Sequence, residues 1–276
     1  MRKVYNWRTF SLEAAVVLFA LLFAFPLYLT VINAFKSYDQ VVLATISLPQ
    51  KLDLSNFMTV WKQIKFPTAF MNSLIITVCS VSGILLFSSM TAYKLVRSPG
   101  WLSSVIFFTV LSAMIVPFQT MMIPLVKVAK DMHLINSIPG IIAVYLGFGT
   151  SMALFLFHGF IKGIPLELED SAKIDGCSPI GVFFRIVFPL LTPITVSVAI
   201  LKTLQIWNDF LLPLLMLSGK NNQTIPLSYF IYFGEYVNQW HLALAAVVLS
   251  VLPVLILYLF SQKYIIQGIM AGAIKG

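Results

Sequence analysis

The stretch Pro165-Leu-Glu-Leu-Glu-Asp-Ser-Ala-Lys-Ile-Asp-Gly176, which runs on to Ile186-Val-Phe-Pro189, is a charge-dense interruption in the second half of a very apolar sequence. Five charged side chains fall within nine residues of it: Glu167, Glu169, Asp170, Lys173 and Asp175. An apolar stretch bounded by prolines follows directly. We interpret this segment as a polar element held between two membrane helices, suited to receive a soluble partner.

The rest of the chain consists largely of long apolar runs. Of its 276 residues 59% are hydrophobic and 10% are charged, and the mean hydropathy is +0.92, whereas soluble domains carry about 25% charged residues. A helix needs about 20 apolar residues to cross the hydrocarbon of a bilayer. We predict an all-α membrane protein whose single transmembrane domain covers residues 1–276. Its six expected spans lie at roughly residues 12–35, 68–93, 102–126, 136–161, 186–217 and 241–263.

The first run predicts a retained helix rather than a cleaved signal peptide. Arg2, Lys3 and Arg8 precede it, but its apolar core exceeds the h-region of a signal peptide and no clear cleavage site follows. Lys and Arg are more numerous in the segments that this orientation places inside. We therefore expect a multi-pass protein of the cytoplasmic membrane with both termini in the cytoplasm.

Composition and motifs exclude several other functions. The net charge of +8 comes from cations on loops of both faces, without the basic stripe of a nucleic-acid-binding protein. Neither Cys79 and Cys177 nor the three scattered histidines form a metal or disulfide pattern. A phosphate-binding GxxxxGK[ST] motif is missing. We expect no enzyme and no cofactor on this chain, and any ATP and Mg²⁺ to be held by partner subunits.

Local signals in the charged stretch predict a short helix, a tight turn and a second short helix. Pro165 suits a first helical turn, and the carboxylates that follow suit the positive end of the helix dipole. Gly176 is expected to end the helix, since glycine readily adopts a positive φ. Ser178 and Pro179 then supply the cap and first residue of the next helix.

The same residues resemble the EAA loop of permease subunits of ABC importers, whose consensus is E-A-A, three residues, G, nine residues, I-x-L-P. Asp170-Ser171-Ala172 stands for E-A-A, followed at the kept spacing by Gly176, Ile186 and Pro189. Three positions depart from the consensus: Asp170 for Glu, Ser171 for Ala and Phe188 for Leu. The first two keep charge and small size, and Glu169 is a second candidate for the role of the glutamate.

The resemblance extends over most of the chain and is nearest to the second permease of maltose-type and multiple-sugar importers. It includes Phe70–Ile75, Val116–Leu125, Trp207–Pro213 and Gly268–Gly276. It implies a heterodimer with a second permease in the lipid membrane, two ATPase subunits, an extracytoplasmic solute-binding protein and a carbohydrate substrate, expected to be an oligosaccharide. The implied ATPase-coupling residues are Glu169, Asp170, Ser171, Ala172, Asp175, Gly176, Ile186 and Pro189.

Two further segments are secondary candidates for partner contacts under this resemblance. The tail Ala273–Gly276 is a candidate contact with the ATPases, and the loop Ser218–Trp240, rich in aromatic and amide side chains, is a candidate contact with the solute-binding protein.

The fifth apolar run carries a second polar pattern. Lys202, Gln205 and Asp209 are spaced i, i+3 and i+7, so they share a helix face, with Asn208 beside them. Because an ionisable group at the bilayer centre costs at least about 2.5 kcal/mol, this face should adjoin a cavity or a partner. Two interpretations stay open: the wall of a translocation path, or interhelical bonds. Gln119 is a further path candidate, whose alternative is a satisfied amide in a kinked third helix.

Three alternatives to a carbohydrate importer remain at this stage. The nearest is an ABC permease for another solute, such as a polyol or glycerol phosphate. A self-sufficient secondary carrier is disfavoured because the charged loop has no role in it. A membrane enzyme would need a convergent polar site, for which the sequence gives no sign.

Overall fold

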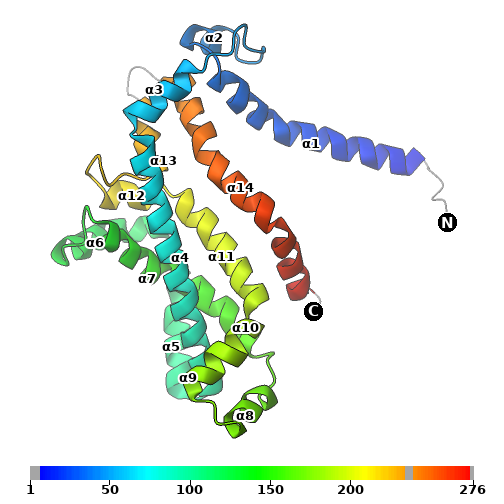
Figure 1. Ribbon diagram of the computed structural model, residues 1–276, viewed down its shortest axis with the longest axis vertical. Coiled ribbons are helices and arrows are strands. Elements are labelled where there is room, and N and C mark those ends of the chain that lie inside the picture. The colour runs from blue at the N-terminus through cyan, green and yellow to red at the C-terminus, as the bar shows by residue number, and fades with distance from the viewer. Residues whose placement is uncertain (1–6, 234–238, 274–276) are drawn as a thin grey trace. The chain divides into compact units, whose positions relative to one another are not determined.

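The computed structural model describes residues 7–233 and 239–273, and every regular element in them is a helix (Figure 1). This confirms the all-α class. The helices are α1 Trp7–Ala34, α2 Tyr38–Leu43, α3 Ser55–Gln63, α4 Phe66–Arg97, α5 Trp101–Ser112, α6 Phe118–Asp131, α7 Ile138–Ile161, α8 Glu167–Ile174, α9 Pro179–Val182, a π-helical turn Phe183–Val187, α10 Phe188–Leu190, α11 Thr192–Trp207, α12 Leu211–Met216, α13 Ile225–Ser228, a 3-10 turn Tyr229–Tyr232 and α14 Trp240–Ala273.

Three helices of the described residues are long and apolar enough to cross a membrane: Thr9–Ala34, Phe66–Arg97 and Ile138–Ile161. A fourth is obtained if Pro179–Leu190 and Thr192–Trp207, which meet at a bend of 75°, form one broken span. Trp101–Ser112 and Trp240–Ile256 are shorter apolar helices. The presence of six spans therefore stays a prediction.

Two of the predicted spans are not single helices. Residues 102–126 are divided between α5 and α6, because Pro117 is extended (φ −60°, ψ 135°) and begins a new helix instead of kinking an existing one. Residues 186–217 are divided among the π-helical turn, α10, α11 and α12. Each division creates two more helix ends, whose backbone N–H and C=O groups lack partners within the helix. Side chains or neighbouring segments must therefore supply these hydrogen bonds.

The chain forms two compact units, one of residues 1–67 with 228–253 and one of residues 68–227 with 254–276. In the first unit, Lys36 is 1% exposed, and its ammonium donates to the Ala44 carbonyl (2.7 Å) and to Asn33 Oδ1 (3.0 Å). Asn56 Nδ2 donates to the carbonyls of Ala34 (3.0 Å) and Lys36 (2.8 Å), at the end of α1. Side chains thus satisfy the backbone where α1 ends.

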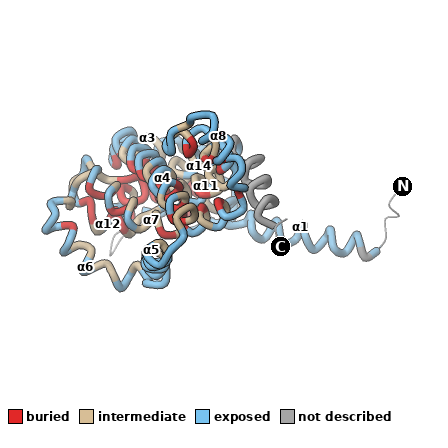
Figure 2. The backbone as a smooth tube through the Cα atoms, turned by 90° about the horizontal axis from the view of Figure 1, so that it is seen from below, coloured by how far each residue is buried: buried red, intermediate tan, exposed pale blue. Residues whose placement is uncertain are grey.

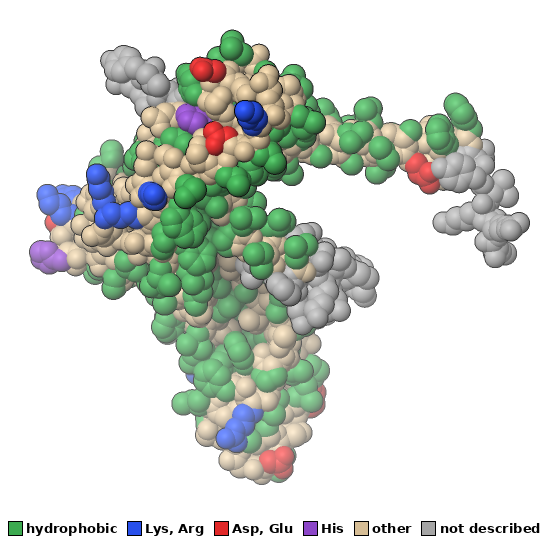
Figure 3. All heavy atoms as spheres, turned by 45° about the horizontal axis from the view of Figure 1, so that its top comes forward, with side chains coloured by type: hydrophobic (Ala, Val, Ile, Leu, Met, Phe, Trp, Pro, Cys, Tyr) green, Lys and Arg blue, Asp and Glu red, His purple; other side chains and the backbone are tan. Residues whose placement is uncertain are grey.

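Most of α1 lies open to its surroundings (Figure 2). From Ala14 to Phe25 its exposed residues are apolar on all sides, for example Leu18 at 68% and Phe23 at 77% exposure, and hydrophobic side chains cover this part of the helix (Figure 3). A helix without a polar face is stable against lipid or another protein rather than against water.

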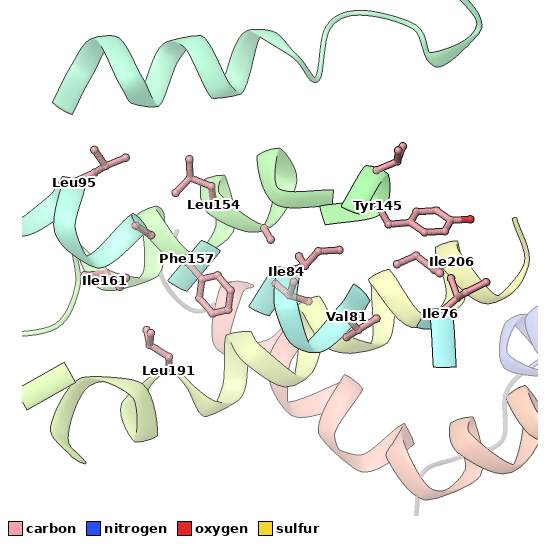
Figure 4. Close-up of a cluster of buried hydrophobic side chains, with 14 of the residues drawn as sticks. Ile76, Val81, Ile84, Leu95, Tyr145, Leu154, Phe157, Ile161, Leu191 and Ile206 are labelled. Atoms are coloured by element: carbon pink, nitrogen blue, oxygen red, sulfur yellow. The ribbon is translucent and has the colours of Figure 1, made fainter. Parts of the chain in front are cut away.

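The core of the second unit lies among α4, α7 and α11. Ile84, Leu154 and Phe157 are fully buried at the centre of the cluster, with Tyr145 near one end beside Ile206 (Figure 4). Glycine lets α4 and α7 approach closely: a Cβ added at Gly149 would lie 2.3 Å from Ile84 Cδ1. This packing sets the position of Tyr145 relative to α11, and hence the shape of a cavity between them.

Candidate functional site

The charged stretch forms the predicted short helix pair at the end of the second unit where α5 also begins (Figure 1). Helix α8 is followed by Gly176 at φ +82°, and Ser178 caps α9 by accepting a hydrogen bond from Gly181 N (3.2 Å). Pro165 precedes α8 and its N-cap residue, Leu166, instead of lying in the first turn as predicted. The positive φ of Gly176 and the side-chain cap of Ser178 therefore stabilise the turn between α8 and α9.

Glu169 is the buried member of the charged set, with 1% exposure. Its carboxylate accepts hydrogen bonds from Arg97 Nε (2.7 Å) and from the Tyr93 hydroxyl (2.7 Å). Arg97 Nη2 also donates to the Ile164 carbonyl, 2.9 Å away, in the segment before α8. These four residues, Tyr93, Arg97, Ile164 and Glu169, form what we call the anchor network. It fixes α8 to the end of α4, and charge-assisted bonds of this kind are among the strongest available.

The opposite side of the helix pair is exposed. Asp170, Ser171, Asp175 and Gly176 all face out, while Ala172 is 6% exposed and packs inward beside Glu169. The exposed Lys173–Asp170 ion pair (2.8 Å) contributes little to stability. Apolar side chains lie among these polar groups, with Ile174 at 86% and Ile180 at 70% exposure. We call Leu168, Asp170, Ile174, Gly176 and Ile180 the docking face, a mixed surface typical of protein interfaces.

Ile186 and Pro189 lie away from the docking face. Ile186 belongs to the π-helical turn Phe183–Val187, and Pro189 belongs to α10, directly before the 75° bend into α11. Tyr93 of the anchor network stacks obliquely on Phe183 of that turn, with ring centroids 5.3 Å apart. These two predicted coupling residues therefore lie in the connection between α8–α9 and helix α11.

A cavity of about 340 Å³, lined by both apolar and polar residues, lies elsewhere in the same unit. Three of the five predicted path residues line it: Lys202, Gln205 and Asp209. Asn208 is exposed and donates to its own helix at the Leu204 carbonyl (2.8 Å), and Gln119 is exposed outside the cavity. The remaining lining residues are Phe118, Tyr145, Phe148, Gly149, Ile206, Leu211 and Leu212.

Asp209 holds the cavity wall together where α11 ends. Its Oδ1 accepts from the backbone N–H of Leu211 (2.9 Å), which caps α12, and its Oδ2 accepts from the Tyr145 hydroxyl (2.9 Å). Neither Tyr145 nor Arg97 was predicted as a site residue, because a single tyrosine or arginine gives no sign in the sequence of a partner more than 60 positions away. The i, i+4 pair Tyr93 and Arg97 was the one available sign of a polar face there.

Replacing Asp209 with alanine is expected to destabilise the protein by about 1–3 kcal/mol, because α12 loses its cap and the Tyr145 hydroxyl loses its acceptor. Asp209→Asn keeps an acceptor oxygen and should lose less. Thermal unfolding of the purified protein in detergent measures both. Equal stability of wild type and Asp209→Ala would contradict the structural role of this side chain.

The first part of the loop Ser218–Trp240, which is predicted to contact the solute-binding protein, is hydrogen-bonded to α4. Asn72 Nδ2 donates to the carbonyls of Asn221 (2.8 Å) and Gln223 (3.0 Å), and Ser73 Oγ accepts from Ile225 N (2.9 Å). Residues 234–238 of the loop, and residues 274–276 of the candidate C-terminal contact, lie outside the described part of the chain.

Comparison with known families matches residues 84–270 to the binding-protein-dependent transport system inner membrane component family. The chain belongs to this family. It is therefore a transport permease and not an enzyme, and it lies in a membrane as a multi-pass protein. The matched residues include α8, α9 and every residue that lines the cavity.

Curated relatives match the sequence of the permease along its full length. It is 40% identical over 275 residues to the probable starch degradation products transport system permease protein AmyC of Thermoanaerobacterium thermosulfurigenes, covering 100% of both chains. It is 35% identical to the melibiose/raffinose/stachyose import permease protein MelC of Bacillus subtilis, covering 98% of each chain. These identities place the permease among carbohydrate-uptake relatives, as the sequence resemblance implied.

A solved structure has the same fold. A chain from the crystal structure of a bacterial ABC transporter involved in the import of the acidic polysaccharide alginate superposes with a TM-score of 0.82, covering 95% of the permease and 99% of that chain. The two are 22% identical, so the likeness concerns the fold alone.

Proposed function

We propose that this permease is one of two membrane subunits of an ABC importer for a neutral oligosaccharide. Support comes from the relatives, whose names specify starch degradation products, melibiose, raffinose and stachyose, and arabinooligosaccharides. A second permease subunit completes the pore, and a solute-binding protein delivers the sugar from outside. Two ATPase subunits hold the ATP and Mg²⁺, since this chain carries no phosphate-binding motif.

The observation that carries the proposal is the docking face on an anchored helix. Its apolar side chains are exposed in water, which is unfavourable unless a partner covers them. The anchor network on the other side of α8 connects the helix firmly to α4, and the π-helical turn connects it to α11. An ATPase seated on the docking face thus moves α4 and α11 when the ATPase pair closes.

This function fixes the orientation of the permease. The docking face must lie in the cytoplasm, where ATP is, so both termini are cytoplasmic if the spans number six. Lys94, Arg97 and Lys162 lie at or just past the helix ends nearest α8, as expected for cytoplasmic flanks of membrane helices.

Co-purification of partner subunits tests the docking face. We expect tagged wild-type permease from native membranes to bring down a second permease and an ATPase, and Ile174→Asp to lose the ATPase while keeping the second permease. A charge buried without a partner in an interface makes the binding free energy less favourable by several kcal/mol. Leu43→Asp is the matched control, because Leu43 is 84% exposed in the first unit. Equal ATPase recovery with Ile174→Asp would contradict the proposed docking face.

A further inference from the structure

A cavity lies between the start of α6, α7, α11 and α12, and none of the docking-face residues lines it. Its volume of about 340 Å³ lies in the range of small-molecule sites, about 300–1,000 Å³. Aromatic rings supply one part of its wall: Phe118 and Phe148 contact edge to face with centroids 5.6 Å apart, and Tyr145 lies beside Phe148 along α7. Lys202, Gln205 and Asp209 supply polar groups.

Lys202 is the informative member of this wall. It is 4% exposed, and in the described part of the chain its ammonium makes one side-chain hydrogen bond, to Gln205 Oε1 at 2.9 Å. The described residues place no carboxylate within ion-pair distance of it. An ammonium has three donors, so two N–H groups remain for a molecule in the cavity. Burying these N–H groups in a membrane interior without hydrogen-bond acceptors is unfavourable.

The other polar groups limit what that molecule can be. Gln205 uses its carbonyl oxygen for Lys202 and keeps its amide N–H groups as donors. Asp209 has both oxygens engaged, by Tyr145 and by the backbone of α12, so its charge is partly offset within the protein. One cation and one carboxylate line the cavity, and their formal charges cancel. The site therefore suits a neutral molecule with many hydroxyl oxygens and an apolar face.

We propose that this cavity binds one sugar ring of the neutral oligosaccharide during its passage. The C–H face of the ring packs on Phe118 and Phe148, while Lys202 and Gln205 donate to its hydroxyl oxygens. Asp209 and Tyr145 hold the wall in place. The inference rests on the proposed function for its substrate class and adds that this subunit itself contacts the sugar.

Protection of an engineered thiol tests the site in the whole importer. The permease carries Cys79→Ser, Cys177→Ser and Leu211→Cys, and the complex is reconstituted with its partner subunits and trapped with ATP and vanadate. We expect maltotriose, raffinose or arabinotriose, whichever the complex imports, to slow maleimide labelling of Leu211→Cys by about tenfold or more. Labelling of Asn208→Cys, next to the cavity but outside it, should not change.

A second substitution separates binding from a general change of shape. Lys202→Met removes the donors at similar length and is expected to abolish most of the protection, since a hydrogen bond to a charged group accounts for about tenfold or more in affinity. Leu201→Met, one position away and 47% exposed, should leave protection intact. Protection that survives Lys202→Met would overturn the role of this lysine, and protection by trigalacturonate alone would overturn a neutral sugar.

Failure of this site differs from failure of the proposed function. If wild type imports one of the sugars and labelling of Leu211→Cys is unaffected by it, the sugar passes elsewhere and the inference is wrong. If wild type imports none of the neutral oligosaccharides, the proposed substrate class is wrong.

Discussion

Arg97→Met is expected to destabilise the permease by about 3–5 kcal/mol, the usual loss when one member of a buried ion pair is removed. Glu169 would keep its charge at a position that is 1% exposed, with the Tyr93 hydroxyl as its remaining donor in the described structure. The Ile164 carbonyl would lose its donor as well. Thermal unfolding of the purified complex in detergent measures the loss, and ATP-driven uptake should fall with it.

Three further variants separate charge from packing. Arg97→Met combined with Glu169→Gln removes both charges and should recover most of the lost stability. Arg97→Lys should recover only part, because an ammonium lacks the planar fork that reaches Glu169 and the Ile164 carbonyl together. Lys173→Met removes a cation from the exposed pair with Asp170 and should have little effect. A loss with Arg97→Met no larger than with Lys173→Met would contradict the anchor network.

Gly176→Trp is expected to reduce ATPase binding about thirtyfold or more, the equivalent of about 2 kcal/mol at an interface hot spot. A Cβ at Gly176 meets no atom of the permease within 4 Å, so the bulk of tryptophan would lie in the space that the ATPase occupies. The measurement is the amount of ATPase that co-purifies with tagged permease at limiting ATPase concentration.

Gly176→Ala is the matched control for backbone strain. The φ of +82° is unfavourable for any residue with a Cβ, by roughly 1–2 kcal/mol, and alanine and tryptophan share that cost. Alanine should therefore lower stability without removing the ATPase. If both variants lose ATPase equally, strain in the turn and not contact explains the effect, and Gly176 is not part of the docking face.

Local signals explain why the helix pair of the charged stretch could be predicted. Gly176, Ser178 and Pro179 each act on the backbone within a few residues, and the structure forms the turn and cap that they indicate. The anchor network could not be predicted in this way, because Arg97 and Glu169 are 72 positions apart and meet only when α4 packs beside α8. The sequence suggested that a carboxylate one residue before Asp170 could share its role, but not that it would be buried.

Only the cavity residues that lie close together in the sequence could be predicted. The spacing of Lys202, Gln205 and Asp209 placed them on one helix face, and they line one cavity. Asn208, predicted beside that face, is not among the residues that line the cavity and donates instead to the Leu204 carbonyl of its own helix. Gln119 lies outside because Pro117 begins α6 separately and points Phe118 to the cavity instead. Tyr145 comes from another helix, so only tertiary packing brings it to Asp209.

The most direct test of the account is uptake of labelled maltotriose, raffinose and arabinotriose by proteoliposomes containing the purified complex. We predict accumulation of at least one sugar that requires ATP on the ATPase side and the solute-binding protein on the other. Ion gradients without ATP should have no effect. Accumulation driven by an ion gradient in vesicles that contain this permease alone would contradict the account and would identify a self-sufficient carrier instead.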